Sequence, residues 1–348
     1  MADETGPRIH SEAFARRAKF ECVAFVLMSD SHVELVDEHH FSVAAKFLEF
    51  LRLSNPTWGK RDAAPKSSFI FRGHWDSDWA LTPPAWREDG QRKLAPIRER
   101  ITEIVSKICT RDDPHCIKWA TQNVQEFIAL RTFHSVADEQ GLELPQFPLG
   151  HNNRENWFWD LEWLKSFGQY DASFTEALLQ IMALAQHHGV PTRLLDWTRD
   201  PRIAAYFAAA DEQRVKESAS DTLAVWAVNQ NIFNQAGVNP LTIPRFRNAY
   251  LHAQEALFTY QRPGEILNWF RDRETWPSLT DLKEKYLYAC AEPPFIKATL
   301  PKSEADDLLS HLYREHISKA RLMPSYDSVA QTSRTLWRIS PENGQWFS

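Results

Sequence analysis

Hydrophobic positions along the chain recur with two periods, one typical of α-helices and one typical of β-strands. Helical spacing and polar, helix-prone composition mark the segments 40–53, 88–140, 173–188 and 303–317. Short apolar runs predict strands at 67–73, 192–197, 223–228, 250–261 and 294–300. Because short strands and helices are interleaved along the chain, the pattern predicts an α+β fold with a mixed β-sheet.

Local capping signals predict where several of these helices begin. Ser42 is a candidate N-cap for the first helix. Ser173 followed by Glu176 forms a capping box, in which each side chain satisfies the free amide of the other residue. Asp200 followed by Pro201 is a further helix start, because Asp accepts from free amides and Pro suits the first helical turn. A helix, a short buried strand and a second helix are therefore expected in this part of the chain.

One large domain accounts for most of the predicted elements. Residues 1–30 carry mixed charges without a clear period, and we expect them to form an N-terminal tail or a loosely attached element. Residues 31–340 form the predicted domain, with a helical insertion at about 88–170. Within that insertion, the aromatic stretch 156–167 predicts a short helix whose tryptophans anchor a core.

Composition and charge narrow the class of protein. The chain has 348 residues, 43% of them hydrophobic and 25% charged, with a net charge of −6. These values exclude a disordered chain and argue against a dedicated nucleic-acid coat protein. No stretch approaches the roughly 18 apolar residues of a membrane span, and the four cysteines form no Cys-x-x-Cys pair. We therefore expect a cytoplasmic protein without membrane association, disulfide framework or metal site.

Several stretches, in order along the chain, carry a family resemblance. They are Phe71-Arg72-Gly73-His74 with Trp79, Leu81, Pro83 and Arg87; the run Gln-His-His-Gly-Val-Pro-Thr-Arg-Leu-Leu-Asp-Trp-Thr from Gln186 to Thr198; Pro201 with Ala205-Tyr206-Phe207-Ala208; Ala253-Gln254 with Leu257-Phe258-Thr259; and Leu322-Met323-Pro324 with Tyr326 and Asp327. Together they resemble the FRG domain family, which is named for the Phe-Arg-Gly stretch. The resemblance runs from about residue 40 to about residue 330, and the run from Gln186 makes it specific.

The order of these motifs is also similar to that of ADP-ribosyltransferase-like proteins. Those proteins have an Arg or His on a first strand, a Ser- or Thr-ended strand that leads into a helix, and a later strand with an acidic or amide residue. Here Arg72 matches the first position, Thr198 the second, and Gln254 or Glu255 the third. The resemblance implies a single domain with a split β-sheet core and NAD as the substrate. It also implies a bacterial toxin or anti-phage effector that modifies a nucleic acid or a protein, and it leaves room for an antitoxin or other partner protein.

The residue types in these motifs suit a dinucleotide. The planar fork of Arg72 can donate paired charge-assisted hydrogen bonds to a diphosphate, and Gly73 would let the ligand approach the backbone closely. Trp79 and Tyr206 have rings that would stack on nicotinamide or adenine. Glu255 is the candidate carboxylate beside the ribose, where it would stabilise an oxocarbenium-like transition state and accept a proton.

Several other candidate site residues have a structural role as their alternative. His74 and His188 would reach a ligand, although a charged histidine at a helix end also stabilises that end. Arg193 would bind a phosphate, but a charge on a buried strand is usually paired, and the same holds for Asp196. Arg72 is also suited to pair with Asp196 or with Asp76 in a partly buried ion network.

One departure from the transferase pattern leaves the chemistry open. The Arg-Ser-Glu transferases place their catalytic Glu two residues after an acidic or amide residue, whereas two residues after Gln254 this chain has Ala256. Glu255 would point to the opposite face of an extended strand. Three functions therefore remain: an NAD-using transferase, a non-catalytic nucleotide- or RNA-binding module, and an RNA-end processing enzyme whose arginines bind phosphates.

Overall fold

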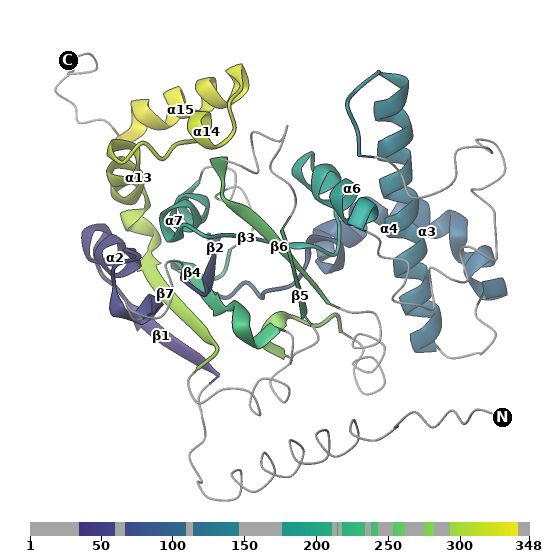
Figure 1. Cartoon of the computed structure of the whole chain (residues 1–348), viewed down its shortest axis with the longest axis horizontal. Helices are drawn as coiled ribbons and strands as arrows, with labels where there is room; N and C mark the ends of the chain where they lie inside the picture. The colour runs from purple at the N-terminus through teal and green to yellow at the C-terminus, as the bar shows by residue number, and fades with distance from the viewer. Residues whose placement is uncertain are drawn as a thin grey trace, which may run out of the picture. The chain divides into compact units, whose positions relative to one another are not determined.

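The strands form one sheet of mixed direction (Figure 1). Within the described residues the sheet has seven strands in the order β1-β7-β4-β2-β3-β6-β5, and β1 runs parallel to β7 while the other neighbours are antiparallel. The strands are β1 (Val36–His40), β2 (Phe69–His74), β3 (Leu195–Thr198), β4 (Thr222–Asn229), β5 (Val238–Leu241), β6 (Ala256–Gln261) and β7 (Phe295–Pro301). The predicted single α+β domain with a mixed sheet is confirmed.

The computed structural model describes most of the chain. The described residues are 35–59, 67–108, 114–145, 176–210, 214, 218–233, 238–242, 253–261, 275–281 and 293–339. By contacts between residues, the chain divides into the units Met1–Glu34 and Leu35–Ser348. The predicted N-terminal tail, the aromatic helix at 156–167 and the Ser173 capping residue lie outside the described residues.

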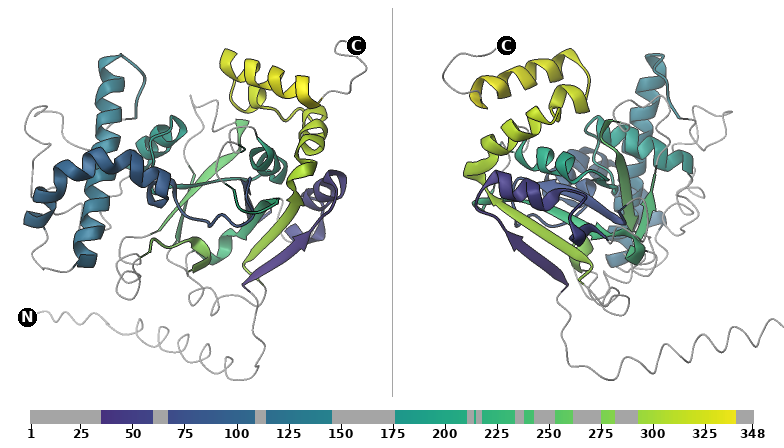
Figure 2. Two further views of the ribbon diagram at one scale, coloured as in Figure 1. Left: turned by 180° about the vertical axis from the view of Figure 1, so that it is seen from behind. Right: turned by 60° about the vertical axis from the view of Figure 1, so that its left-hand side comes forward.

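The described helices fall into two groups, one on the β1 side of the sheet and one on the β5 side (Figures 1 and 2). The first group is α2 (Ala44–Leu51), α7 (Pro201–Ala209), α13 (Ala305–Arg314), α14 (Lys319–Leu322) and α15 (Tyr326–Ile339). The second group is α3 (Glu88–Ile108), α4 (Pro114–Glu139) and α6 (Glu176–His187). Helices α3 and α4 belong to the predicted insertion, whose residues from 146 onward lie outside the described residues.

Strand β4 lies near the middle of the sheet, as its continuous apolar sequence predicts. All of its residues except the first and the last are buried. Alternate residues face two hydrophobic clusters, Leu223, Val225 and Ala227 on one side and Ala224, Trp226 and Val228 on the other. The first cluster includes side chains of α2, α7 and α13, so these helices cover one face of the sheet. A strand buried on both faces has no polar side to alternate with the apolar one.

Helix α7 packs directly against β2 because Gly73 has no side chain. A Cβ atom at this position would lie 1.9 Å from the carbonyl oxygen of Ala204 and 2.6 Å from the backbone nitrogen of Ala208. Only glycine therefore allows this distance between helix and strand. The helix begins as predicted, because the Asp200 side chain accepts a hydrogen bond from the Arg202 amide at 2.8 Å.

The N-terminal end of α2 is capped by a distant residue and not by the predicted Ser42. The helix begins at Ala44, and its N-cap residue Val43 makes no side-chain hydrogen bond. The Ala44 amide donates instead to the Glu304 carboxylate at 3.0 Å, from the turn that precedes α13. A carboxylate also suits the positive end of the helix dipole.

Four of the described strands differ clearly from the prediction, and two of them, β1 and β5, were not predicted at all. Strand β3 begins at Leu195, three residues later than predicted, and β6 begins at Ala256, so the start of the predicted strand 250–261 is wrong. Residues 254 and 255 form a turn. Strand β1 was not predicted, because its sequence Val-Asp-Glu-His-His is mostly polar and it pairs only with β7 at the edge of the sheet.

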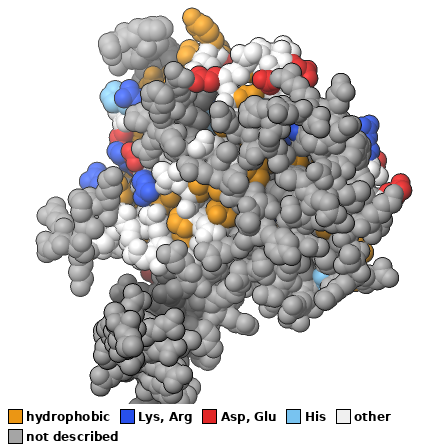
Figure 3. Space-filling view, turned by 45° about the vertical axis from the view of Figure 1, so that its right-hand side comes forward, with side chains coloured by type: hydrophobic (Ala, Val, Ile, Leu, Met, Phe, Trp, Pro, Cys, Tyr) orange, Lys and Arg blue, Asp and Glu red, His pale blue; other side chains and the backbone are white. Residues whose placement is uncertain are grey.

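The surface carries both signs of charge. On the face shown in Figure 3, basic and acidic side chains of the described residues lie close together, with hydrophobic side chains between them. A charged site on such a surface depends on the local arrangement of a few side chains. Among the described residues, we find no helix with the length and hydrophobicity that crossing a membrane requires.

Candidate functional site

Strands β2 and β3 meet at one point, and Arg72 bridges them beyond it. The two strands share one register pair, Phe71 with Thr198. Arg72 Nη1 donates to the backbone carbonyl of Asp196 at 2.8 Å and to its carboxylate Oδ1 at 2.7 Å. The Arg72 side chain is 10% exposed. The predicted alternative, an ion pair between Arg72 and Asp196, is therefore present in the structure.

His74 holds the guanidinium of Arg72 in this position. Its Nε2 accepts from Arg72 Nε at 2.9 Å, and its Nδ1 lies 3.1 Å from the carbonyl oxygen of Trp79. Because Nε2 accepts, the ring is neutral and its Nδ1–H donates to Trp79. His74 is buried, and the Trp79 ring lies edge-on to it with ring centroids 6.0 Å apart. The buried His74 ring therefore fixes the position of the Arg72 guanidinium.

Asp196 is an open carboxylate beside Arg72, with 53% of its side chain exposed. Desolvation would raise the pKa of Asp196, but the charge and hydrogen bond of Arg72, together with the charge of Arg87, lower this pKa below its usual value. Gln186 Nε2 of α6 donates to Asp196 Oδ1 at 3.3 Å. The Thr192 hydroxyl donates in turn to the Gln186 side-chain oxygen. Asp196 is therefore ionised and oriented from two sides.

Arg87 places a second guanidinium in the same neighbourhood. It directly precedes α3, and the Ala85 amide two residues earlier donates to the Thr192 carbonyl at 3.0 Å, close to the start of β3. Arg87 Nε donates to the Thr82 carbonyl at 2.7 Å. Arg87 Nη2 is buried and has no hydrogen-bond partner within the described residues. Burial first, and then the charge of Arg72, lower the pKa of Arg87 to about 10.

Sequence reasoning assigned no site role to Arg87 or to Gln186. Both residues stand in the family-like stretches, Arg87 with the Phe-Arg-Gly motif and Gln186 at the start of the second stretch. Their position in those motifs was the sequence signal that could have indicated a site role for both residues. Their meeting with Arg72 and Asp196 depends on tertiary contacts that no local spacing indicates.

The turn before β6 is held to the end of β3 by Thr198. The Thr198 hydroxyl donates to the Gln254 carbonyl at 2.7 Å and accepts from the Asp200 amide at 3.1 Å. Gln254 Nε2 donates to the carbonyl of Leu322 in α14 at 3.4 Å. Glu255 has a φ of 47° and is exposed. Because Gln254 and Glu255 lie in a turn, the alternation of faces predicted for an extended strand does not apply to them.

Arg193 is part of the core, where it makes the structural pairing that was predicted as the alternative to ligand binding. Its side chain is 0% exposed, and its Nε donates to the Glu126 carboxylate of α4 at 2.9 Å. Its Nη2 donates to Asn123 Oδ1 at 2.5 Å, and its guanidinium lies 5.1 Å from the centre of the Trp119 ring. The structural alternative holds, because a buried cation needs a paired anion and further acceptors.

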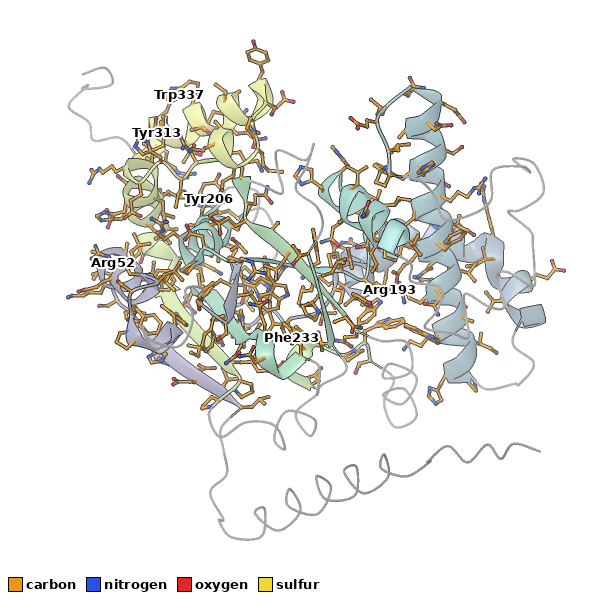
Figure 4. The ribbon with its side chains drawn as sticks, viewed as in Figure 1. Arg52, Arg193, Tyr206, Phe233, Tyr313 and Trp337 are labelled. Carbon is orange, nitrogen blue, oxygen red and sulfur yellow. The ribbon has the colours of Figure 1, made fainter. Side chains whose placement is uncertain are left out.

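Three other predicted site residues lie away from the junction of β2 and β3 or face other groups. The close approach at Gly73 is to helix α7 and not to a ligand. Tyr206 is 7% exposed and belongs to the hydrophobic cluster of α7 and α13, and Figure 4 shows it well apart from Arg193. His188 is exposed at the C-terminal end of α6, where it stacks on Phe133 with ring centroids 6.2 Å apart.

The junction of β2, β3 and the turn before β6 is therefore the candidate site. Two groups of residues lie there. Arg72, His74 and Trp79 of the predicted residues interact with one another and with Asp196, Gln186 and Arg87. Thr198, Gln254 and Glu255 lie at the end of β3 and in the turn before β6, and the register pair of Phe71 with Thr198 joins the two strands β2 and β3. Arg72 and Arg87 both interact with Asp196, and Arg87 interacts with Asp89 as well, so the two guanidinium groups offer an anion hydrogen-bond donors among carboxylates. The exposed carboxylates are suited to accept hydrogen bonds from hydroxyl groups.

Comparisons with known proteins agree with the sequence resemblance. The family model described as the FRG domain matches residues 147–217, which include the run from Gln186 to Thr198 and the start of α7. Comparison with the curated proteins and with the solved structures gave no significant match. The family match therefore supports the resemblance to the FRG domain family over residues 147–217.

Proposed function

We propose that this chain binds NAD at the junction of β2, β3 and β6 and acts as an ADP-ribosyltransferase-like protein. The observation that carries the proposal is that the three strands of the motif order are neighbours in the sheet, in the order β2-β3-β6. Arg72 lies on β2, Thr198 ends β3 before helix α7, and Gln254 directly precedes the register of β6 with β3. This strand order supports the proposal, because β2 and β3 are neighbours although Arg72 and Thr198 are more than a hundred positions apart in the chain.

The side chains at this junction suit the two chemical parts of NAD. Arg72 is held by His74 and Asp196 in one orientation, which favours binding of a diphosphate because little side-chain freedom is then lost. An oxocarbenium-like transition state at the ribose needs a nearby anion. Asp196 and Glu255 are exposed carboxylates at the junction, and Asp196 is kept ionised by Arg72.

The acceptor of the ADP-ribose would be a nucleic acid or a protein, as for a bacterial toxin or an anti-phage effector. The family resemblance supports this part of the proposal. An effector of this kind would act in the cytoplasm, and an antitoxin or other partner protein would restrain it.

The test is nicotinamide release from NAD by the purified full chain, measured by chromatography with and without cell lysate. We expect the wild type to release nicotinamide and Arg72→Gln to lose the activity. Arg52→Gln is the matched control, because Arg52 is exposed beyond α2, away from the junction (Figure 4). An unchanged rate in Arg72→Gln, or a wild type that neither binds NAD nor releases nicotinamide, would overturn the proposal.

A non-catalytic nucleotide- or RNA-binding module is the second candidate. It is favoured by Ala256, which stands where the Arg-Ser-Glu transferases have their catalytic Glu and is only 8% exposed. NAD binding that Arg72→Gln weakens, without nicotinamide release by the wild type, would establish this candidate. The RNA-end processing candidate loses support, because Arg193 is buried and paired with Glu126.

A further inference from the structure

We propose that Arg87, together with Arg72, forms the binding site for the pyrophosphate of the dinucleotide. This inference rests on the proposed function and deepens it, because it names the residue that binds the most highly charged part of the ligand. Arg87 lies in the segment between η2 (Pro84–Trp86) and α3, outside the strands that carry the transferase-like motif order.

Two hydrogen bonds fix Arg87 beside the start of β3. The Ala85 amide donates to the Thr192 carbonyl at 3.0 Å, which ties this segment to the loop that leads into β3. Arg87 Nε donates to the Thr82 carbonyl at 2.7 Å, which holds the guanidinium itself. The segment is also packed from inside, since Ala85 and Trp86 are buried against Leu94 and Trp119. Arg87 is therefore pre-positioned without a ligand.

The same guanidinium has a donor that the described residues do not use. Arg87 Nη2 is buried and has no hydrogen-bond partner among them. A buried cationic nitrogen without an acceptor is unfavourable, and native proteins seldom keep one without a reason. A phosphate oxygen would supply the acceptor and a negative charge at the same time.

The charged groups around Arg87 also bear on the binding of a pyrophosphate. Arg72 and Arg87 repel each other, and Asp196 is the carboxylate that attracts both. Arg72 Nη1 is already bonded to Asp196, and its Nε is bonded to His74. Asp89 also attracts Arg87, so the group that remains available to a ligand is Arg87 Nη2, the donor that the described residues leave unused. A pyrophosphate spans two phosphates, so that each guanidinium would bind one of them.

The ligand chemistry follows from the neighbours. Asp196 would repel a phosphate placed on its exposed side, but its carboxylate oxygens are suited to accept from sugar hydroxyls. A molecule that combines a pyrophosphate with a ribose satisfies both the arginines and Asp196. ADP-ribose has these two parts, and inorganic pyrophosphate has the first alone.

The experiment measures binding of ADP-ribose and of inorganic pyrophosphate to the purified full chain by calorimetry. We expect Arg87→Gln to weaken both roughly tenfold or more, because it removes a charge-assisted contact. Arg52→Gln should leave both affinities unchanged. Arg87→Lys keeps the charge but not the planar fork, so it should weaken binding less than Arg87→Gln.

The outcomes separate this inference from the proposed function. Equal affinities of Arg87→Gln and Arg52→Gln would overturn the inference and leave the proposed function intact. Binding that is lost in Arg87→Gln, in a wild type that releases no nicotinamide, would support the inference and overturn the transferase. A wild type that binds neither compound would overturn the inference. If Arg87→Gln does not fold, Arg87→Lys takes its place. Weaker binding by Arg87→Lys than by Arg52→Gln would then support the inference, and equal binding would overturn it.

Discussion

The buried ion pair between Arg193 and Glu126 gives the sharpest test of the structure. Their side chains are 0% and 1% exposed, and the two groups are 2.9 Å apart. Glu126 also accepts hydrogen bonds from Gln122 at 2.6 Å and from Trp86 at 3.3 Å. Replacing Glu126 by Gln keeps the shape of the side chain and an acceptor oxygen. It removes the charge that compensates Arg193.

The expected loss of stability follows from the depth of burial. An unpaired cation in a dry interior costs far more than the ion pair itself contributes, and breaking one buried partner costs about 3–5 kcal/mol. With a urea slope of about 3 kcal/mol per molar, this loss lowers the unfolding midpoint by about 1–1.7 M. Replacing both partners, as Arg193→Met with Glu126→Leu, should recover much of the loss, because no charge then remains buried.

Urea unfolding followed by tryptophan fluorescence measures these changes. The control is Glu49→Gln, which breaks the exposed pair between Lys46 and Glu49 on α2, and its midpoint should equal that of the wild type. A fall of less than about 1 kcal/mol in Glu126→Gln would refute the buried pairing of Arg193. Such a result would return Arg193 to the list of residues free to bind a phosphate.

Three further changes have defined outcomes. Gly73→Ala should lower the free energy of unfolding by about 3 kcal/mol or more, because the added Cβ would lie 1.9 Å from the Ala204 carbonyl oxygen. Thermal unfolding measures this loss, and an unchanged melting temperature would contradict the close packing of α7 on β2. Asp76→Asn should cost about 1–3 kcal/mol at pH 7, because burial would raise the pKa of Asp76 but hydrogen bonds from three backbone amides and a serine hydroxyl lower it. Because the pKa of Asp76 is lowered in the folded state, its ionised carboxylate stabilises the fold above about pH 4, and this stabilisation disappears as the pH falls through the folded pKa. The unfolding curves of the wild type and of Asp76→Asn should therefore coincide in acid and differ at neutral pH. Asp200→Ala should cost about 1 kcal/mol by removing the cap from the Arg202 amide, which thermal unfolding measures and an equal melting temperature would disprove.

Local sequence signals predicted the strands and helices that form the candidate site better than they predicted the contacts between its side chains. The strand at Phe71, the central strand at 223–228 and the helix that begins after Asp200 are confirmed, because each depends on an apolar run or a cap within a few residues. The prediction for 250–261 was wrong at its start. Strand β6 begins at Ala256, and the positive φ of Glu255 just before it is a backbone state that an apolar pattern does not encode.

The roles of the arginines could not be separated from the sequence. Arg72, Arg87 and Arg193 all stand in family-like motifs. Arg193 meets Glu126 on α4, Arg72 meets Asp196 on the neighbouring strand, and Arg87 donates to the backbone carbonyl of Thr82 and interacts with Asp196. These differences depend on which carboxylate each guanidinium reaches across the fold, and a motif does not specify that distance.

The amino-acid sequence by itself determined the α+β class, the resemblance to the FRG domain and the order of the motif-bearing strands, because hydrophobic period, caps and motif spacing act over neighbouring residues. Only the tertiary structure decided that β2, β3 and β6 lie side by side and that Arg72 bridges the first two. The physical reason is that a charged side chain pairs with a group from a distant segment of the chain, whereas an apolar run forms its strand or helix among neighbouring residues. Burial then decides which of those charges are structural and which remain available to a ligand.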